Sequence, residues 1–334
     1  MSENAIHDYH QLSPETVLNA VESLGLVCDG RLQALNSFEN RVYLIGLDDN
    51  SEHSEIVTKF YRPQRWSNGQ ILEEHDFCEE LAQNEIPVVT AMTFGQNSQS
   101  LHEFQGYRFS LFPKKGGRAL DLEDFDVLEQ MGRFLGRMHQ VGKVKTFQHR
   151  ELLSPQSYGE YSREFLSSNG FIPKDLETAY ESLSADILKQ VDACYQQAGD
   201  IQLIRTHTDF HPGNILWTDD GPHIVDFDDC RMAPACQDIW MMLSGDRGDM
   251  IAKLDAILEG YQQFCEFDHR ELILIEALRS LRLMHYYAWL AKRWQDPAFK
   301  QAFPWFNSQR CWEEHILSLR EQAAAMNEPA LSLF

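Results

Sequence analysis

Apolar residues follow two different periods along the chain. In the first third, short apolar runs stand between turn-forming residues, which is typical of β-strands, whereas longer stretches with helical spacing dominate the rest. The expected strands cover residues 55–61, 107–113, 201–204, 215–217 and 223–225. A turn within residues 35–45 is expected to enter a further strand, and another strand is expected to begin at residues 86–89. The expected helices cover residues 14–24, a segment opened by a Ser67–Gln70 capping box, residues 124–140 and a stretch from Glu271 to Leu290.

This order of elements predicts an α+β fold with two lobes. Residues 1–113 are expected to form an antiparallel sheet with a helix, and residues 114–334 a larger, mainly helical lobe. The pair Gly116-Gly117 marks the boundary. Residues 143–200 are polar and helix-prone, and they are expected to form either part of a lid or a docking surface.

Composition narrows the class of protein. The chain has 334 residues, 43% hydrophobic and 24% charged, as globular proteins do. A net charge of −22 argues against a nucleic acid or an acidic membrane as partner, because both need a basic surface. The sequence has no run of 18 apolar residues and no secretory leader pattern at its start. Seven cysteines without a CxxC pair are typical of a reducing compartment, so we expect a cytoplasmic protein.

The densest group of polar side chains lies at residues 207–214. It stands between two apolar runs, and an Asp-Gly turn at residues 218–221 follows the second of them. Apolar runs on either side of such a turn predict a β-hairpin. The hairpin would fold Asp226 back toward Asn214, so that these side chains and Asp209 converge from two adjacent loops.

These residue types and their spacing indicate phosphoryl transfer from a magnesium nucleotide. Asn214 and Asp226 offer the oxygen ligands that Mg²⁺ prefers, and Asp209 is left to accept and orient the proton of an attacking hydroxyl. Asp209 and Asn214 are five residues apart, as in the protein-kinase catalytic loop, and Asp226-Phe227-Asp228 stands where kinases have Asp-Phe-Gly. The pattern His-x-Asp-x-His-x-Gly-Asn resembles the aminoglycoside phosphotransferase-like branch of the kinase fold, which implies ATP as the donor.

A lysine and a glutamate in the first lobe form a second candidate group. Lys59 lies in the strand expected at residues 55–61, and Glu74 lies on the apolar face of the helix that follows. A carboxylate on a buried face is costly unless it is paired. A Lys59–Glu74 ion pair would satisfy both groups and place Lys59 at the ATP phosphates. Glu73, about 100° away around the helix, is the alternative partner.

Two further segments are candidates for nucleotide contact. Residues 35–45 stand where a kinase has its phosphate-covering loop, but they contain no glycine. Backbone N–H groups of a tight turn and the Ser37 hydroxyl can still bind phosphate, although an ordinary hairpin turn explains the residues equally well. Leu111 to Pro113 end a strand just before the expected lobe boundary, where the backbone of a kinase hinge meets adenine.

The histidines of the motif allow a rival interpretation. We expect His207 to hold the loop by hydrogen bonds and His211 to shape it. Together with Asp209 and Asp226, however, they also match a zinc or two-metal hydrolase. Against this alternative, no further His or Cys cluster has metal-ligand spacing.

Several charged residues near the motif have two interpretations each. Asp228 and Asp229 are either solvated loop acids or helpers at the metal. Asp238 either caps a helix or braces the catalytic loop. Arg279 and Arg282 either serve a phosphate or an acidic substrate, or are solvated, which is the commoner case.

Five longer blocks of sequence extend the comparison beyond the catalytic motif. They cover residues 35–43, 59–66, 71–75, 132–139 and 294–299. They resemble the bacterial stress response kinase A family over nearly the whole chain. This resemblance implies a cytoplasmic monomer that phosphorylates Ser and Thr of proteins with ATP and Mg²⁺ and protects against stress-induced and toxin–antitoxin-driven death.

The same resemblance implies residue roles. Asp209 is the proton acceptor, Asn214 and Asp226 are magnesium ligands, Asp226 also counts as an active-site residue, and Ser37 contacts ATP. The residues alone do not separate a protein acceptor from a small one. His211 stands where Ser/Thr protein kinases usually have lysine, as it does in small-molecule kinases, so a choline, homoserine or aminoglycoside type of kinase is the alternative.

Overall fold

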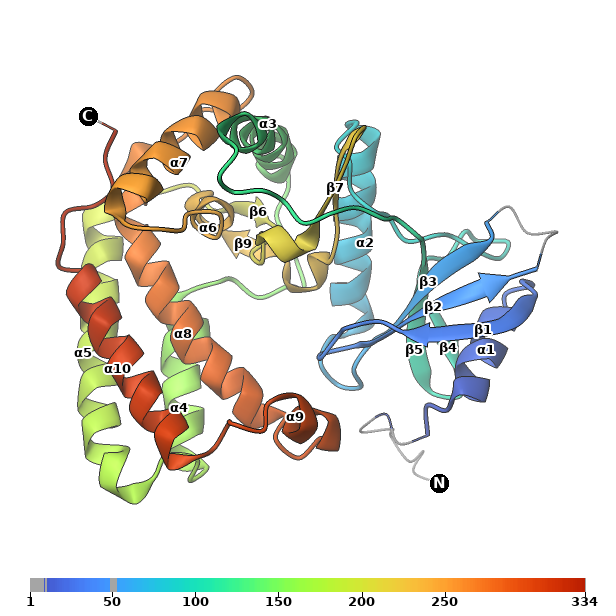
Figure 1. The fold of residues 1–334 in the computed structure, drawn as a ribbon, viewed down its shortest axis with the longest axis horizontal. Helices are drawn as coiled ribbons and strands as arrows, with labels where there is room; N and C mark the ends of the chain where they lie inside the picture. Colours follow the sequence, from blue (N-terminus) through green and yellow to red (C-terminus); the bar gives the residue numbers. More distant parts are fainter. Residues whose placement is uncertain (1–8, 10, 49–52, 334) are drawn as a thin grey trace. The chain divides into compact units, whose positions relative to one another are not determined.

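The computed structural model describes residues 9, 11–48 and 53–333, and the chain divides into two units (Figure 1). One unit comprises residues 1–120 and 213–228, and the other comprises residues 121–212 and 229–334. The segment 213–228 thus packs with the N-terminal part although it lies far along the chain. The lobe boundary expected after residue 113 stays a prediction.

The first unit is built on a five-stranded antiparallel sheet with the strand order β1-β2-β3-β5-β4. Its strands are β1 (Cys28–Ala34), β2 (Arg41–Leu47), β3 (Glu55–Phe60), β4 (His102–Phe104) and β5 (Tyr107–Pro113). Helix α1 (Pro14–Glu22), capped by Ser13, packs Val17 and Val21 into a core with Phe60 and Phe109. Lys59 lies in the central strand β3, so neighbouring strands flank it on both sides.

Helix α2 (Asn68–Gln83) carries the glutamate that the sequence analysis singled out. The capping box between Ser67 and Gln70 is present, as predicted. The buried face of α2 includes Ile71, Phe77 and Leu81, and Glu74 lies on this face with only 3% of its surface exposed. The helix therefore presents one carboxylate from an otherwise largely apolar buried face.

The predicted hairpin also belongs to the first unit and is confirmed. It consists of β7 (Ile215–Thr218) and β8 (Gly221–Ile224), paired from Ile215–Ile224 to Thr218–Gly221. The prediction of a strand at residues 86–89 is wrong, because these described residues form an isolated bridge, between Val88 and Ile224, instead of a strand. Pro87 has no N–H group to extend a ladder.

The second unit is mainly helical. Its helices are α3 (Phe125–Gly142), α4 (Tyr161–Ser168), α5 (Lys174–Ala198), α6 (Cys236–Trp240), α7 (Arg247–Tyr261), α8 (Ile275–Lys292), α9 (Pro297–Ala302) and α10 (Gln309–Ala325). Two short strands, β6 (Ile204–Thr206) and β9 (Arg231–Ala233), pair in antiparallel fashion. The first unit contains an antiparallel sheet with helices, and the second is mainly helical. This arrangement confirms the α+β class.

Three details of the second unit refine the sequence-based expectations. The strand expected at residues 201–204 begins only at Ile204, since its pairing partner is the short strand β9. The helix expected from Glu271 starts as a 3-10 turn at His269–Leu274 and becomes α-helical at Ile275. Within residues 143–200 the longest element is α5, 25 residues long, which places Tyr180 and Val191 in the core, and a lid or docking role of the segment stays a prediction.

Two global expectations concern membranes and thiols. Within residues 9, 11–48 and 53–333, every helix is too short or too polar to cross a lipid bilayer. The start of the chain, on which the expectation of no leader rests, lies outside the described residues. All seven cysteines are free thiols, and six of them are buried.

Candidate active site

The hairpin brings the two candidate metal ligands together. Asn214 directly precedes β7, and Asp226 is the second residue after β8. The N–H of Val225, between β8 and Asp226, donates to the carbonyl of Asn214 at 3.0 Å. The side chain of Asp226 is 57% exposed, whereas Asn214 is largely buried. Asp226 has a φ of +63°, a left-handed conformation that is uncommon outside glycine. The hairpin therefore places the exposed carboxylate of Asp226 next to Val225, whose backbone is bonded to that of Asn214.

This pair fits a magnesium nucleotide better than a metal cage made of protein groups. One carboxylate and one amide oxygen leave most places of an octahedral ion to phosphate and water oxygens, which is how Mg²⁺ binds at nucleotide sites. Among the residues that the structure describes, no group of three or more His, Cys, Asp and Glu side chains could hold a metal ion. The donor set thus matches Mg²⁺ and does not match the zinc alternative.

Lys59 is the centre of the charged groups in the first unit. Its Nζ lies 3.3 Å from Glu74 Oε1, 3.0 Å from Asp228 Oδ1 and 3.5 Å from Asp226 Oδ1. The predicted Lys59–Glu74 ion pair is confirmed, and Glu73 is not the partner seen. Burial by itself lowers the pKa of Lys59, but the charges of Asp228, Glu74 and Asp226 raise it well above its usual value. Lys59 therefore stays an ammonium ion.

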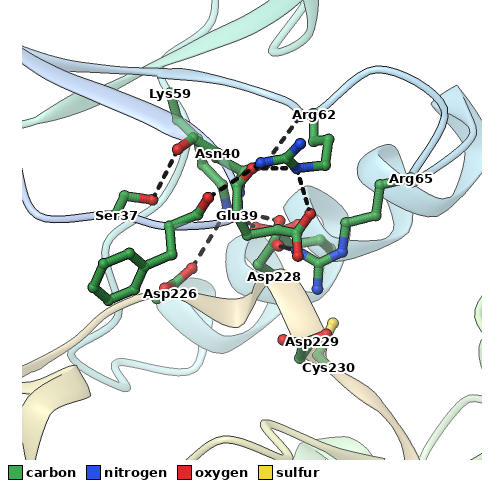
Figure 2. Close-up of polar contacts among 12 residues, drawn as sticks. Ser37, Glu39, Asn40, Lys59, Arg62, Arg65, Asp226, Asp228, Asp229 and Cys230 are labelled. Carbon is green, nitrogen blue, oxygen red and sulfur yellow. Dashed lines mark hydrogen bonds and ion pairs between the residues drawn. The ribbon is translucent and has the colours of Figure 1, made fainter. Parts of the chain in front are cut away.

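Asp228 extends this group, together with two arginines that the sequence analysis did not single out. The interpretation of Asp228 as a solvated loop acid is wrong, because the residue is buried. Asp228 is 4% exposed, and its second carboxylate oxygen forms a short ion pair with Arg65. Arg62 and Arg65 in turn face Glu39, as Figure 2 shows. A signal was present in the sequence, because an acid in place of the glycine of Asp-Phe-Gly needs a cation if it is buried.

The turn that carries Ser37 is shaped by side chains. Ser37 Oγ donates to the carbonyl of Asn40 at 3.2 Å. Asn40 is buried, and its Oδ1 accepts from the N–H of Arg62 at 3.1 Å (Figure 2). These bonds account for an ordered turn without glycine, and phosphate contact by Ser37 stays a prediction.

The expected hinge residues lie at the end of β5. Leu111 is fully buried, and its carbonyl accepts from the N–H of Met92 at 2.7 Å. Pro113 pairs with Ile56 at the end of the strand and is partly exposed. Contact between this segment and adenine stays a prediction, and the carbonyl of Leu111 is already engaged by the N–H of Met92.

Asp209 lies in the second unit, where an arginine and a histidine contact its carboxylate. Arg282 Nη2 of α8 lies 2.7 Å from Oδ1, and His211 Nε2 lies 3.5 Å from Oδ2. Burial raises the pKa of Asp209, but the hydrogen bond from His211 and the charge of Arg282 outweigh it and hold the pKa well below its ordinary value. Asp209 is therefore ionised, as a proton acceptor must be. The chain passes from Asp209 to Asn214, in the other unit, within five residues.

The loop that carries Asp209 is braced from α6. Asp238 is fully buried and accepts from the N–H groups of His207 at 2.8 Å and Thr208 at 2.7 Å. Its Oδ2 also contacts His139 Nε2 at 3.0 Å. Of the two interpretations of Asp238, bracing is correct, since the residue lies inside α6 rather than at its N-cap. His207 is buried and its Nδ1 accepts from the N–H of Asp209 at 3.3 Å, which is the structural role expected for it.

The sequence matches a known family over most of its length. Residues 31–275 match the model of the phosphotransferase enzyme family. Stress response kinase A of Escherichia coli strain K12 is 40% identical over 330 residues, which cover 99% of this chain and 98% of that protein. The Serine/threonine protein kinase RdoA of Salmonella typhimurium strain LT2 is 40% identical over 333 residues, covering 100% of this chain and 99% of that protein.

Solved structures show the same fold. An amicoumacin kinase in complex with AMP-PNP, Ca²⁺ and Ami superposes with a TM-score of 0.70 at 19% identity, covering 97% of this chain and 98% of that one. A microcompartment-associated aminopropanol kinase gives a TM-score of 0.67 at 16% identity, covering 95% and 100%. The match to the family model and the 40% identity over the full length carry the assignment, and the chain belongs to the phosphotransferase enzyme family, in the branch of the stress response kinase A relatives.

Proposed function

We propose that this protein is a Ser/Thr protein kinase of the bacterial stress response, which transfers the γ-phosphate of ATP to protein hydroxyls with Mg²⁺. The observation that carries the proposal is 40% identity, over essentially the whole chain, to relatives named stress response kinase A and Serine/threonine protein kinase RdoA. The arrangement of Lys59, Glu74 and Asp226 supports it, because these are the residue types that hold a magnesium nucleotide in kinases.

Each candidate residue has a role in this proposal. A bound magnesium nucleotide would supply the phosphoryl group, and its Mg²⁺ would offset the negative charge of the phosphate oxygens. Asn214 and Asp226 hold the cation, and Lys59, oriented by Glu74, binds phosphate oxygens. Asp209 accepts the proton of the acceptor hydroxyl, and its low pKa makes it an orienting group more than a strong base.

Nucleotide contacts complete the proposed site. Ser37 would donate to the phosphates from its turn, and the backbone around Leu111 to Pro113 would meet adenine. Both contacts can be tested by binding of ATP to Ser37→Ala and by chemical-shift changes of the hinge amides when ATP is added. An unchanged ATP affinity in Ser37→Ala would remove that residue from the site.

Label transfer from γ-labelled ATP tests the reaction and the class of acceptor together. A generic protein acceptor, choline, homoserine and an aminoglycoside are each offered with Mg²⁺, and Asp209→Asn runs in parallel. Label on Ser and Thr of protein, reduced by about 10²–10⁴-fold in the variant, is the expected result. No transfer to any acceptor by an enzyme that binds ATP would refute the proposal.

A small-molecule hydroxyl kinase is the alternative function. His211 stands two residues after Asp209, where protein kinases usually have a lysine, and it contacts the Asp209 carboxylate. Label on choline, homoserine or aminoglycoside alone would select this alternative and leave the proposed roles of the site residues intact.

The proposed cellular role is protection against death caused by stress and by toxin–antitoxin systems. A bacterium that lacks its own stress response kinase A offers the test. Wild-type protein should restore survival after oxidative or envelope stress, and Asp209→Asn should not. Equal rescue by the variant would separate survival from phosphoryl transfer. The proposed monomeric state is tested by light scattering on the eluting protein.

A further inference from the structure

The turn around Ser37 is attached to the segment that follows β3 at three consecutive residues. The carboxylate of Glu39 is 11% exposed and lies 2.9 Å from Arg62 Nε and 3.6 Å from Arg65 Nη1. Arg62 also donates to the carbonyls of Phe38 and Glu39, and its N–H donates to the buried side chain of Asn40. Side-chain hydrogen bonds and ion pairs thus hold this turn, which contains no glycine, in place (Figure 2).

Arg65 reaches from this turn to the turn of the metal ligand. The nitrogen that faces Glu39 also forms the short ion pair with Asp228 Oδ2. The guanidinium lies over the Trp66 ring, 4.9 Å from its centroid, and the side chain is only 10% exposed. The other oxygen of Asp228 lies 3.0 Å from Lys59 Nζ. One arginine is therefore the common partner of an acid in the Ser37 turn and an acid that binds Lys59.

The balance of charges around Lys59 affects how strongly this lysine can bind a phosphate. Three carboxylates, those of Glu74, Asp226 and Asp228, lie within 3.5 Å of the single ammonium group of Lys59. Buried carboxylates are stable only when cations and hydrogen bonds compensate them. Without Arg65, Asp228 would bind Lys59 more strongly and leave less of the lysine charge for phosphate oxygens. The Glu39 carboxylate of the Ser37 turn would also lose one of its cationic partners.

We propose that Arg65 is a positioning residue for the nucleotide, which sets the Ser37 turn through Glu39 and Lys59 through Asp228 at the same time. This inference rests on the proposed ATP-dependent function. Arg65 acts through its two carboxylate partners rather than on the reacting atoms. Glu39 and Asp228 should consequently be coupled in their effects on nucleotide affinity, with the arginine as the link.

Direct binding of ATP, measured by calorimetry with and without Mg²⁺, tests the role of Arg65. Arg65→Met should raise the Kd of ATP about tenfold, which is the order expected for one buried charge-assisted contact. Arg65→Lys should restore part of the affinity, since it keeps the charge but not the planar fork. Arg31→Met is the matched control: Arg31 also bridges two carboxylates of the first unit, Asp29 at 2.7 Å and Glu55 at 3.5 Å, and should leave the Kd unchanged.

A double-mutant cycle tests the link itself. Glu39→Gln and Asp228→Asn are combined in the wild-type and the Arg65→Met backgrounds, and thermal unfolding is recorded for each variant. In the wild-type background, the Kd of the double variant should differ by about threefold or more from the value expected if the two substitutions acted independently. In the Arg65→Met background, the two effects should be additive. If Arg65→Met does not fold, Arg65→Lys and the cycle in the wild-type background decide the question.

The outcomes separate this inference from the function on which it rests. A lower melting temperature of Arg65→Met with an unchanged Kd would mean a purely structural ion pair and would overturn the inference alone. Additive effects in the wild-type background would do the same. A wild-type protein that binds no ATP would overturn the proposed function and the inference together.

Discussion

Asp226 and Thr208 carry backbone conformations that most residues avoid. Asp226 has a φ of +63° and Thr208 a φ of +64°, and both belong to loops of the candidate site. Such conformations cost about 1–3 kcal/mol for a residue other than glycine and persist where surrounding contacts impose them. Asp238 imposes one of them, because it accepts the N–H of Thr208. The left-handed conformation of Thr208 is therefore stabilised by hydrogen bonds within its own unit.

The left-handed conformation of Asp226 makes Asp226→Asn a clean test of the metal ligand. Asparagine tolerates the left-handed region well and keeps the size of the side chain, so the fold should be preserved. The loss of charge should abolish the gain in ATP affinity that Mg²⁺ produces. Calorimetric titrations of ATP with and without Mg²⁺ measure this gain. An unchanged magnesium effect in a folded Asp226→Asn would remove the residue from the metal site.

Arg282 should set the acid limit of activity through Asp209. The arginine is one of the groups that hold the pKa of Asp209 below its ordinary value, so Arg282→Gln should raise that pKa toward about 4. A proton acceptor works only when ionised, and activity is lost as pH falls through its pKa. The acid limb of kcat/KM should therefore appear at higher pH in Arg282→Gln than in the wild-type protein.

The neighbouring arginine on the same helix provides the control for this pH profile. Arg279 pairs with Glu276 at 2.9 Å, and Arg279→Gln should leave the acid limb in place. Circular dichroism at each pH shows whether the protein is folded. Acid limbs that superpose for wild type and Arg282→Gln would show that the ion pair does not tune the proton acceptor.

At the scale of elements, the closest packing in the second unit joins α3 and α7. The two helices meet through glycines: a Cβ atom on Gly132, Gly136 or Gly260 would overlap a backbone carbonyl of the facing helix. The overlapping carbonyl is that of Glu129 for Gly260. Since neither helix can move away without opening the core, a methyl group has no room there.

Gly260→Ala should consequently destabilise the protein although alanine favours helices. We expect a loss of about 2 kcal/mol or more in the free energy of unfolding, because overpacking outweighs the gain in helix propensity of about 1 kcal/mol. Urea unfolding measures the difference. Gly248→Ala, in the first turn of the same helix, meets only Asp246 Oδ1 at 3.2 Å and should change stability by less than about 0.5 kcal/mol. Equal effects of the two substitutions would contradict this packing argument.

At the scale of the whole molecule, the net charge of −22 should favour basic protein acceptors. Long-range attraction of this kind weakens as salt screens it, and the screening length is about 8 Å at 0.15 M ionic strength. The KM of a basic acceptor protein should therefore rise from low salt to physiological salt. Label transfer at several salt concentrations measures it, with an acidic acceptor of similar size as the control. A KM that falls with salt for the basic acceptor would rule out this contribution.

Local patterns were sufficient to predict much of the fold. The capping box at Ser67, the Asp-Gly hairpin after Asn214 and the helix from residue 125 depend on neighbours within a few residues, so their signals are contained in short windows. The Lys59–Glu74 pair was also predictable, because a carboxylate on a buried helix face needs a cation. The strand expected at residues 86–89 failed because strand length depends on a partner that the window does not contain.

The sequence by itself determined the family, the α+β class and the residue types of the candidate site. The class and the residue types follow from periodicity, spacing and residue chemistry, and the family follows from the resemblance of longer sequence blocks. Only the tertiary structure decided that Arg65 joins Glu39 to Asp228, that Arg282 binds Asp209 and that Asp238 braces the loop at His207. The strength of an ion pair depends on the distance between the charges and on their burial. The residues of these contacts are 26 to 163 positions apart, so packing rather than local sequence brings them together.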